Sequence, residues 1–193
     1  MARLTQQERS RRTREAILVA ARRQFAAQGF SQTTIRSVAA EAEIDPSMVM
    51  RYYGSKRDLF VAATDLDLAL PDLASVPAGE RGDVAIRHFL ALWEGEAGDD
   101  LLRILLASAS TDPEAADRVR AVLAAQLEKV VAAAVDDPAT ARARAALVAT
   151  QILGLALCRY VLRLPAVTEL SPDTIISGVG PVIDLLLTER LDV

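Results

Sequence analysis

Cysteine and histidine each occur only once in this chain of 193 residues, as Cys158 and His88. A single cysteine excludes an internal disulfide, and a histidine without Cys or His companions at ligand spacing gives no basis for a metal site. We therefore expect no metal and no cofactor. The Ser-His-Asp, Cys-His and H-E-x-x-H patterns of common enzymes are missing too, which predicts a protein that is not an enzyme.

Aromatic residues are also scarce, at 4% of the chain, whereas 51% of it is hydrophobic and consists mostly of alanine, leucine and valine. This composition favours helices over strands and is enough to build a sizeable core. No apolar leader occupies the first thirty residues, and polar side chains interrupt the most apolar window, 147–164. We expect an all-helical protein, located in the cytoplasm, with no membrane span.

Charge is distributed unevenly along the chain. Residues 1–60 carry eleven Arg or Lys against six acids, a net charge of +5, whereas the rest of the chain carries −9. The asymmetry indicates that the first sixty residues meet a polyanion, although a solvated basic face without a partner would produce the same pattern.

Proline follows a capping residue at four places, and each pair predicts a helix start: Asp45-Pro46, Asp112-Pro113, Asp137-Pro138 and Ser171-Pro172. Hydrophobic spacing adds a first helix over 10–28 that stops at Gly29, a short second helix that Thr33 can cap, and a fourth over about 55–68. Further helices are expected over 84–93, 100–109, 113–135, 138–164 and 172–191. A linker at 71–83 divides a domain of 1–70 from one of 71–193.

The second and third helices are separated by a very tight turn, which predicts helix-turn-helix geometry. On the third helix, Val49 and Tyr53 share one face and are expected in the core. The opposite face carries Ser47 with Arg51 and Met48 with Tyr52, while Met50 lies at the boundary.

These residues carry a resemblance to a known family. The segment GFSQTTIRSVAAEAEIDPSMVMRYYGSKRDLF, with TREAILVAARRQFAAQG before it, resembles the DNA-binding segment of TetR-family transcriptional regulators. The likeness covers about the first sixty residues. It implies a second helical domain that binds a small ligand and dimerises, and a role as a repressor that the ligand releases from a palindromic operator in double-stranded DNA.

The resemblance also implies roles for individual residues. Base-facing positions correspond to Ser47, Met48, Met50 and Arg51, and phosphate contacts correspond to Thr34, Tyr52 and Lys56. Because a helix N-terminus attracts phosphate, Thr33 or Thr34 at the start of the second helix is also expected to contact phosphate. The turn usually holds a glycine where this chain has Glu43, so a non-glycine residue is expected there in a left-handed conformation.

The second domain lacks a recognisable site motif, so its residues allow more than one interpretation. A pocket for a small apolar or amphipathic effector is assigned to five residues that could equally be core: Phe89, Trp93, Leu105, Leu127 and Leu155. Surplus apolar faces on the last two long helices predict a four-helix homodimer contact: Leu153, Leu157, Val161, Val179, Ile183 and Leu187. The alternative function is a helical ligand-binding or interaction protein without operator recognition.

Overall fold

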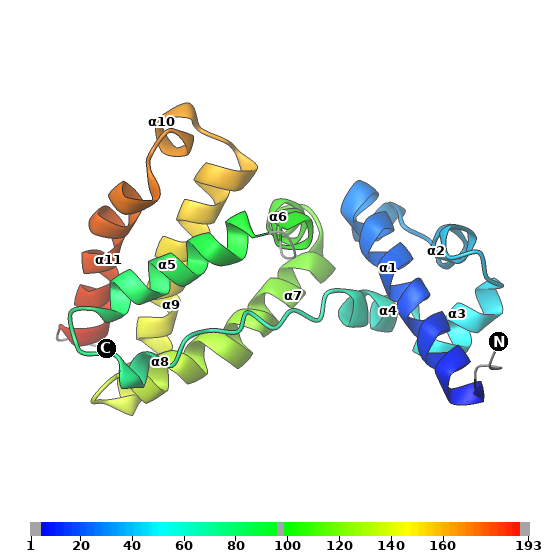
Figure 1. Cartoon of the computed structure of the whole chain (residues 1–193), viewed down its shortest axis with the longest axis horizontal. Helices are drawn as coiled ribbons and strands as arrows, with labels where there is room; N and C mark the ends of the chain where they lie inside the picture. The colour runs from blue at the N-terminus through cyan, green and yellow to red at the C-terminus, as the bar shows by residue number, and fades with distance from the viewer. Residues whose placement is uncertain (1–4, 96–98, 190–193) are drawn as a thin grey trace. The chain divides into compact units, whose positions relative to one another are not determined.

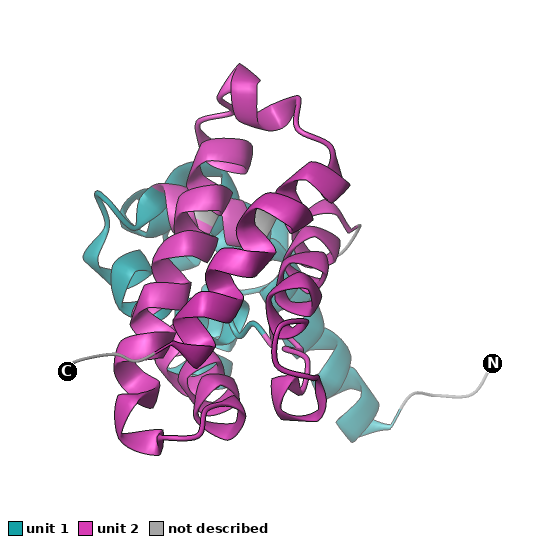
Figure 2. Ribbon diagram, turned by 90° about the vertical axis from the view of Figure 1, so that its left-hand side faces the viewer, with its two compact units in different colours: residues 1–66, 108–118 teal, residues 67–107, 119–193 magenta. Residues whose placement is uncertain are grey.

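The computed structural model describes residues 5–95 and 99–189, and all regular structure within these ranges is helical (Figure 1). The expected all-α fold is confirmed. The chain forms two compact units, shown in separate colours in Figure 2. The first comprises residues 1–66 and 108–118, and the second comprises residues 67–107 and 119–193.

The first unit is a small bundle whose elements are α1 (Gln6–Gln32), α2 (Ile35–Glu41), α3 (Pro46–Tyr53), α4 (Lys56–Ala63) and the start of α7 (Pro113–Val122). Its core takes apolar side chains from each of the first four helices, all at most 4% exposed: Ile17, Phe25, Val38, Val49, Leu59 and Phe60. Phe25 and Phe60 meet edge to face, with ring centroids 4.9 Å apart. This core positions α3 in the unit.

Both ends of α1 follow from local chemistry. The helix begins four residues before the predicted start, because Thr5 and Glu8 form a capping box in which each side chain bonds the other's backbone N-H. The motif T-x-x-E at this position could have revealed it. Gly29 adopts a φ of +74°, so the predicted left-handed stop is confirmed, although one further turn follows the kink to Gln32.

The fourth helix is shorter than predicted, since α4 ends at Ala63 instead of residue 68. The Thr64 hydroxyl donates to the Phe60 carbonyl at 2.7 Å, and the Thr64 carbonyl accepts from Arg118 Nε at 2.8 Å instead of from a further helical turn. Ala69 then takes a left-handed φ of 45°. Non-helical chain therefore begins earlier than the predicted linker, which itself contains a 3₁₀ turn with a buried Leu73.

The second unit is a helical bundle with elements α5 (Arg81–Glu94), α6 (Asp99–Ser108), the end of α7, a π-helical turn (Leu123–Leu127), α8 (Glu128–Ala134), α9 (Ala141–Ala156), a second π-helical turn (Leu157–Val161), α10 (Pro165–Thr168) and α11 (Pro172–Thr188). The predicted starts at the four Asp-Pro or Ser-Pro pairs are confirmed, because each Asp or Ser side chain accepts a backbone N-H of its own helix or 3₁₀ turn. The short α10 was not predicted.

A close crossing of α5 and α11 is central to this unit. A Cβ atom on Gly82 would overlap the Gly180 carbonyl, so only glycine at residue 82 allows the two backbones to approach this closely. At this crossing the buried Asp184 of α11 accepts the Gly82 N-H at 3.1 Å. Asp184 thereby serves as the N-terminal cap of α5, whose own Glu80 makes no side-chain cap bond.

Two arginines cap helix ends in the same way. Arg144 of α9, only 6% exposed, donates to the carbonyls of Leu186 and Glu189 at the end of α11. Arg81 donates to the Ala134 carbonyl at the end of α8. By length and composition the run Pro138–Val161 could cross a membrane, but a single such helix is weak evidence, and its Arg144 is used inside the bundle.

We predict that Asp184→Ala destabilises the protein by about 1–3 kcal/mol, because the buried Gly82 N-H loses its acceptor. Chemical denaturation measures the change. Asp136→Ala, which truncates an exposed loop acid, is the matched control and should change stability by less than about 0.5 kcal/mol. Equal effects of the two substitutions would contradict the capping role.

Candidate nucleic-acid interface

The turn between α2 and α3 sets the orientation of α3 relative to α2. Glu43 adopts a φ of 56°, which confirms the predicted left-handed residue, and the Ile44 N-H returns to the Ala39 carbonyl at 3.0 Å. Asp45 then caps α3 by accepting the Ser47 N-H at 2.8 Å. Hydrogen bonds from Ser47 lower the pKa of Asp45.

The inner face of α3 holds the helix on the first unit. Val49 is fully buried, and the half-buried Tyr53 donates its hydroxyl to the Arg14 carbonyl of α1 at 3.1 Å. Partial burial raises the pKa of Tyr53. The prediction that Val49 lies in the core is confirmed, whereas Tyr53 lies at the edge of the core. The other side of α3 is left uncovered within this unit.

The outer face of α3 presents the predicted set of side chains. Ser47, Met50 and Arg51 are exposed, with Met50 at 44%, while Met48 and Tyr52 are partly covered. The Arg14 guanidinium lies over the Tyr52 ring, 5.3 Å from its centroid. A row of hydroxyl, thioether, guanidinium and phenol groups therefore faces outward from one short helix.

Thr33 and Thr34, the two residues before α2, have different roles. Thr33 is 1% exposed, and its hydroxyl donates to the Gln24 and Gly29 carbonyls, so the predicted cap and phosphate-contact role of Thr33 is wrong. The N-cap is Thr34, which accepts the Ser37 N-H at 3.0 Å and lies exposed. The two hydroxyls look equivalent in sequence, and only the kink at Gly29 decides which one turns inward.

Lys56, at the start of α4, is held more tightly than a surface lysine. Its Nζ donates to the Ser31 carbonyl at 3.2 Å and lies 4.4 Å from the centroid of the Phe30 ring. A lysine ammonium carries three donors, so one bond to Ser31 leaves others for a second acceptor. The contacts fix its position at the edge of the unit.

The start of α7 joins the first unit through charged groups that sequence reasoning missed. Arg57 of α4 pairs with Glu114 at 3.0 Å, and Arg118 donates to Asp65 at 3.0 Å as well as to the Thr64 carbonyl. Both ends of α4 are therefore attached to α7. No local sequence signal links residues more than fifty positions apart, which explains the omission.

In the second unit, three aromatic rings form one cluster. Trp93 stacks on Tyr160 with centroids 4.8 Å apart, and Phe89 lies 5.9 Å from Trp93 and 6.0 Å from Tyr160. Of the five residues assigned to a pocket, Phe89 and Trp93 are buried in the main core, with Leu127 and Leu155 packed against it. Leu105 is also buried, at 4% exposure.

Polar groups close one end of this aromatic cluster. Tyr160 donates its hydroxyl to Glu94 at 3.0 Å, and Arg159 pairs with the same carboxylate at 3.1 Å. Burial, together with the Glu94 carboxylate, raises the pKa of Tyr160 to about 12. Arg159 also donates to the Val167 carbonyl at 2.7 Å, which ties the π-helical turn to α10.

The apolar residues assigned to a dimer contact divide into two groups. Ile183 and Leu187 are at most 3% exposed and pack in the core of their own unit, so their assignment to a dimer surface is wrong. Leu157 is 37% exposed, and Leu153, Val161 and Val179 are partly covered. The uncovered apolar side chains of these helices are Leu147, Leu157, Val182 and Leu185, the last at 56% exposure.

Comparison with known proteins agrees with both units. Residues 17–63 match the family model described as bacterial regulatory proteins of the tetR family, and residues 79–187 match the tetracyclin repressor-like C-terminal domain. No curated protein matches the chain in sequence.

Solved structures also resemble the chain over almost its whole length. A TetR-family regulator from Streptomyces coelicolor is 31% identical, with a TM-score of 0.62 over 92% of this chain and 95% of its own. NalD, a repressor of a multidrug efflux pump in Pseudomonas aeruginosa, is 25% identical, with a TM-score of 0.65 over 89% and 93% of the two chains. The multidrug-binding protein EbrR, solved with malachite green, shares the fold at 24% identity, with a TM-score of 0.60 over 90% and 96%.

We predict that Glu43→Gly stabilises the protein by about 0.5 kcal/mol, because relief of left-handed strain of about 1–2 kcal/mol exceeds the entropic cost of glycine of about 0.4–1 kcal/mol. Ala40→Gly, at an exposed position inside α2, is the control and should cost about 1 kcal/mol. Thermal or urea unfolding gives the sign of each effect. A loss of stability in both variants would refute the strain argument.

Proposed function

Because the chain belongs to the TetR family, and is therefore a DNA-binding transcriptional regulator and not an enzyme, we propose that it is a repressor that a small ligand releases from its operator. The observation that carries the proposal is the uncovered outer face of α3 on a unit of net positive sequence charge. The protein acts as a homodimer on a palindromic operator, in the cytoplasm where the DNA lies.

Some side chains of the interface read the base sequence, and others position the protein on the DNA backbone. Ser47, Met48, Met50 and Arg51 face the base edges of the major groove, and Arg51 can donate two hydrogen bonds to a guanine. Phosphates are contacted by Thr34, Tyr52 and Lys56, which lie at helix ends around α3. Phosphate contacts set the register and base contacts specify the sequence.

A homodimer is supported by the uncovered apolar face of the second unit. Leu157 and Leu185 are large and exposed, and nothing lies within 4 Å of a Cβ placed on Gly154 or Gly178. A second copy would cover these leucines, and the glycines would let its helices approach closely. Two copies related by a twofold axis present two α3 helices to successive major grooves, about 34 Å apart.

The effector is a small apolar or amphipathic molecule bound in the second unit among side chains of the aromatic cluster and its neighbours, which include Phe89, Trp93, Leu105, Leu127 and Leu155. Their apolar and aromatic character supports this class. The binding of malachite green by the structurally similar EbrR is in keeping with it. Release from DNA requires the ligand to prefer the state in which the spacing of the α3 helices no longer fits the operator.

The path for this change is α7, whose first turns belong to the first unit and whose last turn belongs to the second. Arg57 pairs with Glu114, and Arg118 bonds to Thr64 and Asp65. These contacts attach α7 to both ends of α4. A shift of α7 caused by the ligand would move α4, and α3 would follow.

We predict that Arg51→Ala weakens operator binding and relaxes sequence discrimination at one base pair by about 1–3 kcal/mol. The operator can be obtained by selecting duplexes from a random pool, and fluorescence anisotropy then measures affinity for it and for single-base variants. Arg87→Ala removes an exposed arginine from the second unit and should leave both quantities unchanged. If the wild-type protein binds no duplex in a salt-sensitive way, that result would favour the alternative function, which is a helical ligand-binding or interaction protein without operator recognition.

We predict that Leu185→Glu converts the dimer into a monomer, because a carboxylate would enter the buried centre of the contact. Sedimentation equilibrium measures the mass. Val61→Glu places the same charge at an apolar residue of the first unit that is 45% exposed, and it should remain dimeric. A dimer that tolerates glutamate at residue 185 would place the contact elsewhere.

A further inference from the structure

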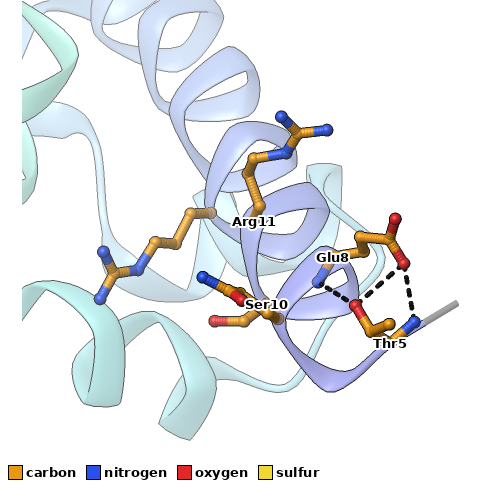
Figure 3. A pocket seen from close by; sticks show the side chains of 6 residues that line it. Thr5, Glu8, Ser10 and Arg11 are labelled. Atoms are coloured by element: carbon orange, nitrogen blue, oxygen red, sulfur yellow. Dashed lines mark hydrogen bonds between the residues drawn. The ribbon is translucent and has the colours of Figure 1, made fainter.

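An open groove lies along the start of α1 and is lined by residues that have not so far been assigned to DNA. It has a volume of about 570 Å³ and is lined by Thr5, Gln7, Glu8, Ser10, Arg11 and Arg14. Figure 3 shows these side chains around the first turns of the helix, with Glu8 directed toward Thr5. Two of its six lining residues are arginines, and both are exposed, so their guanidinium groups can attract an anionic ligand.

Four of the six residues that line the groove share one face of α1. Gln7, Ser10, Arg11 and Arg14 are spaced by three or four positions, so they lie above one another on the helix surface. This row spans about 10 Å of helix, at about 1.5 Å per residue. That length is comparable to the rise of about three nucleotides along one DNA strand.

Arg14 connects this row to α3. Its guanidinium covers the ring of Tyr52 at 5.3 Å, and its carbonyl accepts the Tyr53 hydroxyl at 3.1 Å. The groove and the outer end of α3 are therefore parts of one surface within the first unit. A polyanion that touches Tyr52 can continue onto Arg14 and Arg11.

The charges on this row are free to act on a ligand. In the part of the chain that the structure describes, no acidic side chain pairs with Arg11 or Arg14, whereas Arg23 and Arg57 both have acidic partners. Glu8 is the one acid of the groove, and hydrogen bonds from Thr5 lower its pKa and occupy its Oε2. Two unpaired cations thus remain against one engaged carboxylate.

We propose that the α1 row Gln7, Ser10, Arg11 and Arg14 binds backbone phosphates of the DNA immediately outside the half-site that α3 reads. Arg11 and Arg14 supply the charge, and Gln7 and Ser10 add neutral donors. The inference rests on the proposed function. It extends each footprint beyond the bases that α3 reads, without adding base-specific contacts.

The test compares two duplexes and two variants. One duplex is the selected operator with ten base pairs of flanking sequence on each side, and the other is cut to the bases that α3 protects. Arg11→Gln removes a charge from the row, and Arg12→Gln removes a charge that is also exposed from another face of the same helix. The control therefore corrects for the net charge that both variants lose.

On the long duplex, Arg11→Gln should weaken binding about fivefold more than Arg12→Gln does. It should also lower the salt slope by about 1.8, which is about 0.9 for each of the two copies in the dimer. On the short duplex the two variants should bind equally. Hydroxyl-radical footprinting should show that Arg11→Gln loses protection only in the flanks.

Two results would overturn the inference while leaving the proposed function intact. One is equal affinity of the two variants for the long duplex, and the other is a loss with Arg11→Gln that persists on the short duplex. If the wild-type protein selects no duplex at all, the proposed function and this contact fail together.

Discussion

The anchoring of α3 through its inner face is the interaction on which the interface depends. Val49 is fully buried, and the hydroxyl of Tyr53 reaches the Arg14 carbonyl on α1. Once these two positions are fixed, the 100° step of the helix leaves Ser47 and Arg51 on the outside. The turn at Glu43 and the cap at Asp45 then determine where this face begins. The exposed face of α3 thus results from the packing of a small core, in which each inward side chain determines the direction of its neighbours.

In the second unit, hydrogen bonds between helices add to the apolar core, because side chains of one helix cap the ends of another. Asp184 caps the start of α5, Arg144 the end of α11, and Arg81 the end of α8. Each bond satisfies backbone groups that a helix end leaves without partners. Because these bonds link separate helices, movement of one helix in response to a ligand disturbs the ends of its neighbours. Such a bundle is suited to convert binding into a shift of helices.

Sequence reasoning predicted most of what is local and least of what joins distant segments. The helix starts at Asp45 and Ser171 were predictable because a capping residue followed by proline has one favourable backbone solution. The end of α4 was not, because Arg118, more than fifty residues away, takes the Thr64 carbonyl. Likewise, the sequence assigned Ile183 and Leu187 to the dimer contact, whereas the fold buries both and leaves Leu185 exposed, because neighbouring helices decide which apolar side chains of α11 are covered. The outer face of α3 was predictable from its spacing, whereas the contribution of Arg14 required the fold.

The central claim is that the outer face of α3 meets duplex DNA. Backbone amide chemical shifts of the isotopically labelled protein, recorded by TROSY spectroscopy as the selected operator duplex is added, test it most directly. The account predicts that the largest changes fall on Ser47 to Tyr52 and on the start of α4, and that a scrambled duplex of equal length produces smaller changes there. Large changes confined to the second unit, with the amides of α3 unmoved, would contradict it.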